Sequence, residues 1–323
     1  MIVDCHTHIW QSAQQAGLRV AVRSARLPRS ARQSDKPPFR LQAGAEQHAA
    51  ACKPVDAAIV LGFRSRHLDT EIPNEFIADS VAQYPDRTVG FAGIDPMDGA
   101  KAVDEVHRAR QVLGLKGIVL APASQAMHPA HSRAMAIYDL AERLGLPVVV
   151  HNSPPLAAAA HLEFARPHLL DEVARTFPNL RILLTQVGYP WVDETFVLLA
   201  KHDNVFAEIS GIVQSPWMAL QYMHAASDFG VMDKLCFGSD FPFSTPKAVI
   251  ESLYSLNQIV HGTNLPSVPR EHIRGIVERN SLALLGVDFL VKTAAAGLTD
   301  VLPAVTETPG PDAVTSSKPE PSV

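Results

Sequence analysis

Short apolar runs alternate with longer amphipathic stretches along most of this 323-residue chain. Runs rich in Val, Ile, Leu and Phe, each with the length of a buried strand, lie at residues 2–4, 56–63, 88–94, 117–121, 147–151, 181–185, 205–210 and 235–240. Between or after these runs, apolar residues recur with helical spacing over residues 72–84, 99–113, 131–145, 162–177, 190–202, 246–260 and 270–285. Alternation of this kind predicts parallel strands joined by crossover helices, and eight repeats favour closure into a (β/α)8 TIM barrel.

An open, doubly wound sheet is the alternative architecture. No predicted strand is followed by G-x-G-x-x-G or by G-x-x-x-x-G-K-[ST], so nothing in the sequence marks a dinucleotide or phosphate loop. The closed barrel is therefore favoured, as a single domain over residues 1–290.

Two segments differ from the barrel pattern. Residues 11–44 follow the first strand directly and carry seven basic side chains against one acid, a net charge of +6. Loops after barrel strands lie on the catalytic face, so this basic insert is expected over the barrel mouth. Residues 291–323 are rich in Ala, Thr, Pro, Ser and Glu, with few large apolar side chains, which predicts a disordered C-terminal tail.

Composition and charge exclude several functional classes. Lys and Arg number 28 against 33 Asp and Glu, and this net charge of −5 argues against a general nucleic-acid binder. The three cysteines show no C-x-x-C spacing, so neither a disulfide framework nor a thiolate zinc site is indicated. No signal-peptide pattern or run of transmembrane length is evident. We expect a cytoplasmic protein that acts on a small molecule, without nucleic-acid or membrane partners.

The first strand ends in two histidines. Side chains alternate along a regular strand, so Asp4, His6 and His8 are expected on one face, with Cys5 and Thr7 toward the helices. Barrel enzymes keep their chemistry at the carboxyl ends of the strands, which is where these two imidazoles would converge.

Two further strands end in side chains of the metal-ligand type. The fifth predicted strand, PVVVH, ends in His151, and the eighth, LCFGSD, ends in Asp240. A lone histidine is more often structural than a ligand, but the combination of three imidazoles and one carboxylate suits Zn²⁺ or another divalent first-row metal. The predicted metal ligands are His6, His8, His151 and Asp240.

The motifs VDCHTHIW, PVVVH, LLTQVGYPWVDE, NVFAEIS and FGSDFPF resemble the amidohydrolase superfamily. The resemblance is to the amidohydrolase-related branch that includes aminocarboxymuconate-semialdehyde decarboxylase, and it covers residues 1 to about 288 apart from the insert. It implies one divalent metal bound by the four ligands named above, zinc first and manganese as the alternative. Members with two metals usually bridge them through a carboxylated lysine at the end of strand four, whereas here Lys116 lies at the start of KGIVLAP.

The sequence departs from this family at strand six. Relatives usually show H-x-G there, and the histidine binds or activates the reacting water or moves a proton, whereas this chain has Gln186-Val187-Gly188. Glutamine does not titrate, so it cannot act as a general base near neutral pH. Asp240 is therefore the expected proton carrier, and Gln186 is expected to hold substrate or water.

The resemblance leaves three functions open. The first is a metal-dependent hydrolase that attacks a small, anionic amide, ester or lactone through metal-activated water. The second is a non-oxidative decarboxylase of an unsaturated or aromatic acid. The third, motivated by Gln186, is a catalytically weakened barrel that binds a small acid or a partner. A homodimer is expected only by analogy with the family.

Four residues are candidate substrate contacts. Arg23 in the insert and Arg64 beyond strand two could bind a substrate carboxylate, which suits guanidinium geometry. Asn152, next to His151, could hydrogen-bond substrate, and Trp191 could form a pocket wall. Each has a structural alternative in a solvated loop, loop structure or simple packing. The role of Glu208 on strand seven stays open, because its facing depends on the strand register.

Overall fold

The computed structural model describes residues 1–16, 43–152 and 157–289. Most of the basic insert, including Arg23, and the tail from residue 290 lie outside the described residues. Residues Met1–Lys292 form one unit. The two edges of the first gap are joined, because the Trp10 N–H donates to the Ala43 carbonyl at 3.0 Å.

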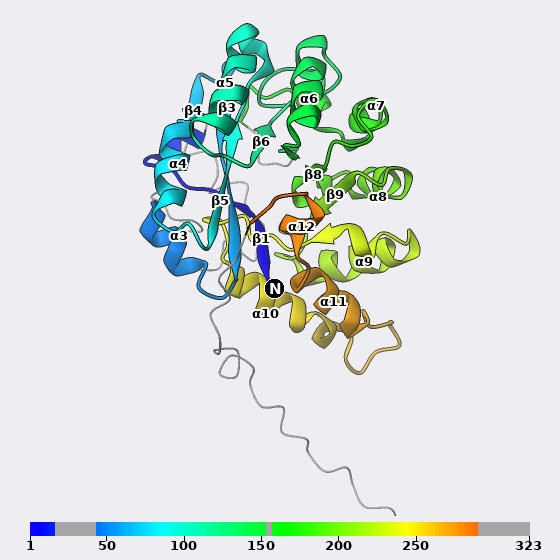
Figure 1. The fold of residues 1–323 in the computed structure, drawn as a ribbon. Helices are drawn as coiled ribbons and strands as arrows, with labels where there is room; N and C mark the ends of the chain where they lie inside the picture. Colours follow the sequence, from blue (N-terminus) through cyan, green and yellow to red (C-terminus); the bar gives the residue numbers. More distant parts are fainter. Residues whose placement is uncertain (17–42, 153–156, 290–323) are drawn as a thin grey trace, which may run out of the picture. The chain divides into compact units, whose positions relative to one another are not determined.

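Eight parallel strands form the centre of this unit, confirming the predicted barrel (Figure 1). In spatial order they are β1 (Val3–Thr7), β2 (Ala57–Leu61), β5 (Thr88–Gly93), β6 (Gly117–Leu120), β7 (Val148–Val150), β8 (Ile182–Leu184), β9 (Val205–Glu208) and β10 (Leu235–Cys236). The segment after β10 returns to β1, where Cys5 N–H donates to the Phe237 carbonyl at 2.9 Å and Asp240 N–H donates to the His6 carbonyl at 2.8 Å. These bonds nearly close the sheet on itself.

Helices surround the strands on the outside (Figure 1). They are α3 (Ala45–Ala51), α4 (Asn74–Ala82), α5 (Ala100–Gln111), α6 (Ser132–Leu144), α7 (Asp171–Thr176), α8 (Val192–Lys201), α9 (Pro216–Asp228), α10 (Pro246–Tyr254), α11 (Arg270–Val277) and α12 (Ser281–Leu284). Short 3-10 segments are η1 (Ala13–Ala16), η2 (Pro96–Asp98), η3 (Leu162–Ala165), η4 (Pro167–Leu170), η5 (Thr185–Gly188), η6 (Met232–Lys234) and η7 (Leu256–Val260). Over the described ranges, we find no helix with the length and apolar character needed to cross a bilayer.

Several details differ from the sequence expectation. The helices predicted over residues 246–260 and 270–285 are each divided, into α10 and η7 and into α11 and α12. The single helix predicted over residues 162–177 is divided into η3, η4 and α7, because Pro167 cannot continue the preceding turn. An antiparallel hairpin, β3 (Phe63–Ser65) and β4 (Thr70–Ile72), follows β2 in place of a longer strand. Helices α3 and α9 were not anticipated.

Apolar side chains fill two layers. Alternate strand residues form an interior cluster, which contains Val3, Cys5, Ala57, Ile59, Leu61, Val89, Phe91, Val119, Val149, Leu183, Phe206 and Cys236. The intervening residues, such as Val60 and Leu184, pack against the helices in a second cluster. Leu282 of α12 and Leu285 after it join the interior cluster, and Figure 1 shows α12 across the middle of the ring. A filled interior leaves the strand ends as the place for a site.

The predicted orientation of Cys5 is wrong. Between the pairs Asp4–Ala58 and Thr7–Val60 the register advances three residues on β1 and two on β2, so the alternation slips by one. Cys5 has the parity of Val3, two residues earlier, and both side chains lie in the interior cluster. Asp4 is buried, and its Oδ1 accepts from the backbone N–H of His6 and of Ser239, at 3.1 and 2.9 Å.

His48 of α3 makes the fold sensitive to acid. Its Nε2 donates to Thr7 Oγ1 at 2.8 Å, and burial lowers the pKa of His48 from 6.5 to about 4. Between pH 4 and pH 6.5, therefore, His48 binds a proton in the unfolded chain but not in the folded chain. The neutral His48 therefore contributes to the free energy of unfolding in full above pH 6.5, and this contribution is lost as the pH falls through about 4. The total loss is about 3 kcal/mol.

The His48→Gln variant keeps an amide donor for Thr7 but does not titrate. Urea unfolding of wild type and variant between pH 7 and pH 4 should show a steeper loss of unfolding free energy in wild type. Parallel pH profiles would contradict the assignment, whatever the constant offset between the two proteins.

Candidate metal centre

Three imidazoles meet at the carboxyl ends of the strands. His6 and His8 come from the end of β1, and His151 directly follows β7. The ring centroids are 4.9 Å apart for His6 and His8, 5.2 Å for His6 and His151, and 5.4 Å for His8 and His151. One ring nitrogen from each lies within 4.8 Å of the others, so the three could hold a divalent metal ion.

Two of these rings have their nitrogens oriented by fixed acceptors. His6 Nδ1 lies 2.8 Å from Glu208 Oε1, and His8 Nδ1 lies 3.2 Å from the Leu61 carbonyl. A carboxylate and a carbonyl only accept, so in neutral rings both Nδ1 atoms carry the proton. The two Nε2 atoms, 3.0 Å apart, then present lone pairs to each other. Two facing lone pairs at this distance need a cation, and this is the donor arrangement that metal-binding histidines show.

The electrostatics of the buried site also favour a positive charge. Burial alone would lower the pKa of His6, but the negative charges of Glu208 and Asp240 outweigh it and raise this pKa to about 9. Burial likewise disfavours ionised Glu208, yet the charge and hydrogen bond of His6 outweigh it and lower the pKa of Glu208. The site is therefore an anionic environment that stabilises a cation at the histidines.

Asp240 lies beside this cluster, and its two oxygens have different neighbours. Oδ1 is 3.5 Å from His6 Nε2, whereas Oδ2 accepts a hydrogen bond from Gln186 Nε2 at 2.8 Å. The side chain is only 8% exposed. The structure thus brings Asp240 and Gln186 into direct contact at the cluster, with Oδ1 facing the histidines.

The turn that presents Gln186 is strained. Within η5, Gln186 has φ 53° and Val187 has φ 46°, a conformation that β-branched residues rarely adopt. Gln186 N–H donates to Glu208 Oε1. Gly211 makes room for the turn, since a Cβ there would lie 2.5 Å from Gln186 Cβ. The surrounding residues therefore stabilise an unfavourable backbone conformation that directs the Gln186 amide to Asp240. Strained residues of this kind are often found at functional sites.

The sequence alone assigns no role to Glu208, whereas in the structure this residue lies at the centre of the site. Glu208 is fully buried. It lies two residues after Phe206 on β9, so it is on the same face of the strand as Phe206, which faces the interior. Gly238 in the F-G-S-D motif provides the space, because a Cβ there would lie 2.3 Å from Glu208 Oε2. An acid two residues after an interior phenylalanine, with a glycine two residues after the β10 residue that pairs with it, was the available signal.

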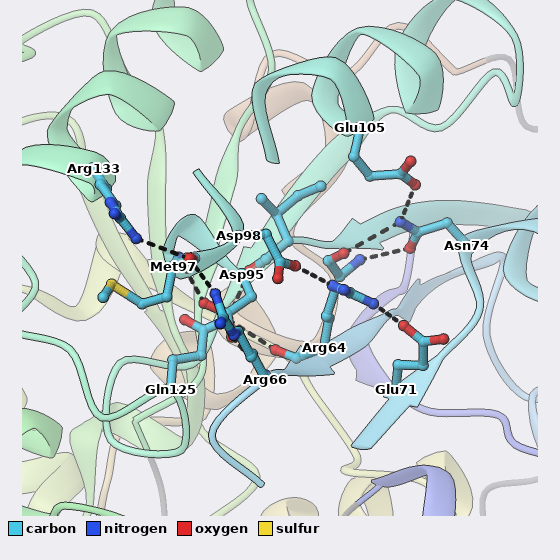
Figure 2. Close-up of polar contacts among 12 residues, drawn as sticks. Arg64, Arg66, Glu71, Asn74, Asp95, Met97, Asp98, Glu105, Gln125 and Arg133 are labelled. Carbon is cyan, nitrogen blue, oxygen red and sulfur yellow. Dashed lines mark hydrogen bonds and ion pairs between the residues drawn. The ribbon is translucent and has the colours of Figure 1, made fainter. Parts of the chain in front are cut away.

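Arg64 is engaged elsewhere (Figure 2). Its Nε donates to Asp98 Oδ2 at 2.5 Å, and its Nη1 pairs with Glu71. Figure 2 shows the guanidinium between these two carboxylates, which belong to η2 and to the β3–β4 hairpin. The structure does not bring this predicted substrate contact to the histidines.

The other two described candidates differ from each other. Asn152 is fully buried beside His151, and neither Oδ1 nor Nδ2 has a hydrogen-bond partner in the described part of the chain. Trp191 precedes α8, and the guanidinium of Arg166 lies over its ring, 5.7 Å from the centroid. Asn152 therefore has unused hydrogen-bonding capacity near the cluster, whereas Trp191 packs in a cation–π contact.

Comparison with known proteins gives a family and a relative. The amidohydrolase family model matches residues 3–287. A γ-resorcylate decarboxylase from Rhodococcus jostii (strain RHA1) is 25% identical over 218 residues, which are 53% of this chain and 65% of that protein. The match thus spans slightly less than two thirds of the relative's length.

Solved structures agree in fold. A dihydroxybenzoic acid decarboxylase from Polaromonas sp. JS666, with bound manganese and the inhibitor 2-nitroresorcinol, superposes with TM-score 0.62 at 16% identity, covering 88% of this chain and 96% of that one. A probable 2-pyrone-4,6-dicarboxylic acid hydrolase from Acinetobacter baumannii, with citric acid bound, gives TM-score 0.60 at 17% identity, covering 88% and 99%. Because the family model covers most of the barrel, the chain belongs to the amidohydrolase family and is an enzyme.

Proposed function

We propose that the chain is a metal-dependent carboxy-lyase that releases CO₂ from a small hydroxylated aromatic acid. The observation that carries this proposal is the pairing of Asp240 with an amide that does not titrate. Decarboxylation requires one proton delivered to a ring carbon, and CO₂ leaves without one. Hydrolysis requires a proton taken from water and another given to the leaving group. Asp240 faces the Nε2 side of His6 and has an amide, not a second acid or base, as its partner, which suits the simpler proton requirement. The curated relative is a decarboxylase.

In this proposal the three histidines and Asp240 Oδ1 hold one divalent ion. When bound, the ion would supply Lewis-acid polarisation of the substrate's carboxylate and its neighbouring hydroxyl. Three imidazoles and one carboxylate suit zinc. Manganese is the alternative, and the Polaromonas decarboxylase was solved with it.

Asp240 and Gln186 divide the remaining work. Asp240 first takes up one proton from solvent. The bond between the ring and the carboxylate carbon then breaks, CO₂ leaves, and the electron pair that stays on the ring carbon takes this proton from Asp240, which returns to its ionised form. The Gln186 amide holds Oδ2 and so fixes the direction of the carboxylate during this transfer.

Hydrolysis of a small ester, amide or lactone is the second candidate function, favoured by the likeness of fold to a probable pyrone-dicarboxylic acid hydrolase. Asp240 would then take the proton from water and pass it to the leaving group. A panel of hydroxybenzoates assayed for CO₂, beside esters and lactones assayed for acid release, separates the two. We expect CO₂ from at least one hydroxybenzoate, and hydrolysis with no CO₂ would overturn the carboxy-lyase proposal.

Asn152 is proposed to bind substrate through its unpaired amide. In Asn152→Leu, a variant of similar volume, KM should rise about tenfold because one hydrogen bond to substrate is lost. The thermal midpoint should not fall, since the amide has no partner to lose among the described residues. The exposed Asn179 serves as the control in Asn179→Leu. An unchanged KM in the Asn152 variant would show that the residue only packs.

A further inference from the structure

We infer that Glu208 is a positioning residue that holds the His6 ring and the Gln186 turn in the arrangement that the site requires. The inference rests on the proposed metal site, but it concerns this chain's own hydrogen bonds. Neither the sequence expectation nor the family comparison assigns a role to Glu208.

Glu208 accepts every hydrogen bond it makes. Its Oε1 receives His6 Nδ1 at 2.8 Å, Ser210 Oγ at 3.1 Å and the Gln186 N–H, and its Oε2 receives the Ser210 N–H at 2.8 Å. The residue is fully buried. An ionised carboxylate accepts only, so it satisfies all four donors at once, whereas an unpaired buried charge would be costly.

These donors come from three different strand ends. His6 belongs to the end of β1, Gln186 to the turn after β8, and Ser210 to the segment after β9. Through His6, Glu208 fixes the Nδ1–H tautomer and leaves Nε2 free for a metal. Through the Gln186 backbone, it supports the strained turn that directs an amide to Asp240. One buried carboxylate thus orients both the candidate metal ligand and the partner of the candidate proton carrier.

Glutamine cannot replace this carboxylate without loss. In Glu208→Gln, one acceptor oxygen becomes an NH₂ donor. Turned toward His6, this donor would favour the tautomer with its proton on Nε2, which blocks the nitrogen that a metal needs. Turned toward Ser210, it would oppose the Ser210 N–H, and the charge that strengthens the His6 bond would be gone in either case.

The decisive measurement is metal affinity in the absence of substrate. Metal-free protein is titrated with zinc and with manganese against a chromophoric chelator, for wild type, Glu208→Gln and Ser210→Ala. We expect Kd to rise about 10- to 100-fold in Glu208→Gln, as when a metal-bound histidine loses its carboxylate partner. Ser210→Ala removes one donor to the same carboxylate and the longer contact of Ser210 Oγ with His6 Nδ1, at 3.4 Å, but it leaves the 2.8 Å bond between Glu208 and His6, so its Kd should stay within about threefold of wild type.

A second readout does not require any metal to bind. ¹⁵N NMR of the histidine rings in metal-free protein, recorded at a pH high enough for the His6 ring to be neutral, should show His6 with its proton on Nδ1 in wild type and in Ser210→Ala, and a shift toward Nε2–H in Glu208→Gln. Gly238→Ala provides a variant that retains Glu208, because the added methyl would lie 2.3 Å from Oε2 and displace the carboxylate, with a looser contact of 3.2 Å to His6 Cβ. It should weaken metal binding in the same direction.

An unchanged Kd together with an unchanged His6 tautomer in Glu208→Gln would overturn the inference. Neither readout depends on which substrate is turned over, so a failure of the carboxy-lyase proposal would leave both results interpretable. If wild type bound no metal, the tautomer experiment would still decide whether Glu208 orients His6.

Discussion

Replacing Asp240 with asparagine should lower kcat by about 10³-fold, because the amide cannot deliver or take up a proton. Its carbonyl oxygen can still face His6, so the three histidines should retain the metal at close to the wild-type stoichiometry. The measurement is kcat at saturating substrate, with metal content determined on the same samples. Loss of turnover with the metal retained would identify Asp240 as the proton carrier rather than as a ligand alone.

Asp193→Asn is the matched control, since Asp193 is exposed in the first turn of α8. This variant should keep wild-type kcat. A kcat for Asp240→Asn within tenfold of wild type would contradict the proposed role. A large loss of metal in that variant would instead make Asp240 mainly a ligand.

Replacing His8 with alanine should lower kcat to about 10³-fold below the wild-type value, because one of the three clustered ring nitrogens is removed. Wild type dialysed against a chelator should lose activity to a similar extent and recover it on addition of zinc or manganese. His8→Ala should recover little under the same conditions.

His261→Ala controls for the loss of an imidazole as such, because His261 is exposed after η7 and outside the cluster. It should behave as wild type in both chelation and recovery. Full activity of chelated wild type would contradict the requirement for a metal at the histidines.

The barrel could be predicted because its cause is local. Each strand is a short apolar run whose alternate residues fill the interior, as Phe91 and Phe206 do, and most crossovers have helical spacing. The details that could not be predicted depend on contacts between distant segments. Pro167 interrupts a helix that its periodicity favoured, and the register of β1 against β2 slips between Asp4 and Thr7.

The candidate site was predictable to a similar depth. Strand ends placed His6, His8 and His151 correctly near one another, since parallel strands in a barrel finish on the same face. The role of Glu208 depends on the register of β9 and on the space left by Gly238, which a single sequence does not show. Arg64 was placed next to a strand end, but its charge is matched by Asp98 and Glu71, which come from other segments.

The central claim is that the three histidines bind one divalent metal ion, and metal content per chain tests it most directly. Untagged wild type and His151→Ala should be analysed by plasma mass spectrometry after growth with added zinc and manganese. The account predicts about one zinc or manganese per wild-type chain and much less in the variant. Essentially no metal in wild type, or an equal amount in both proteins, would contradict it.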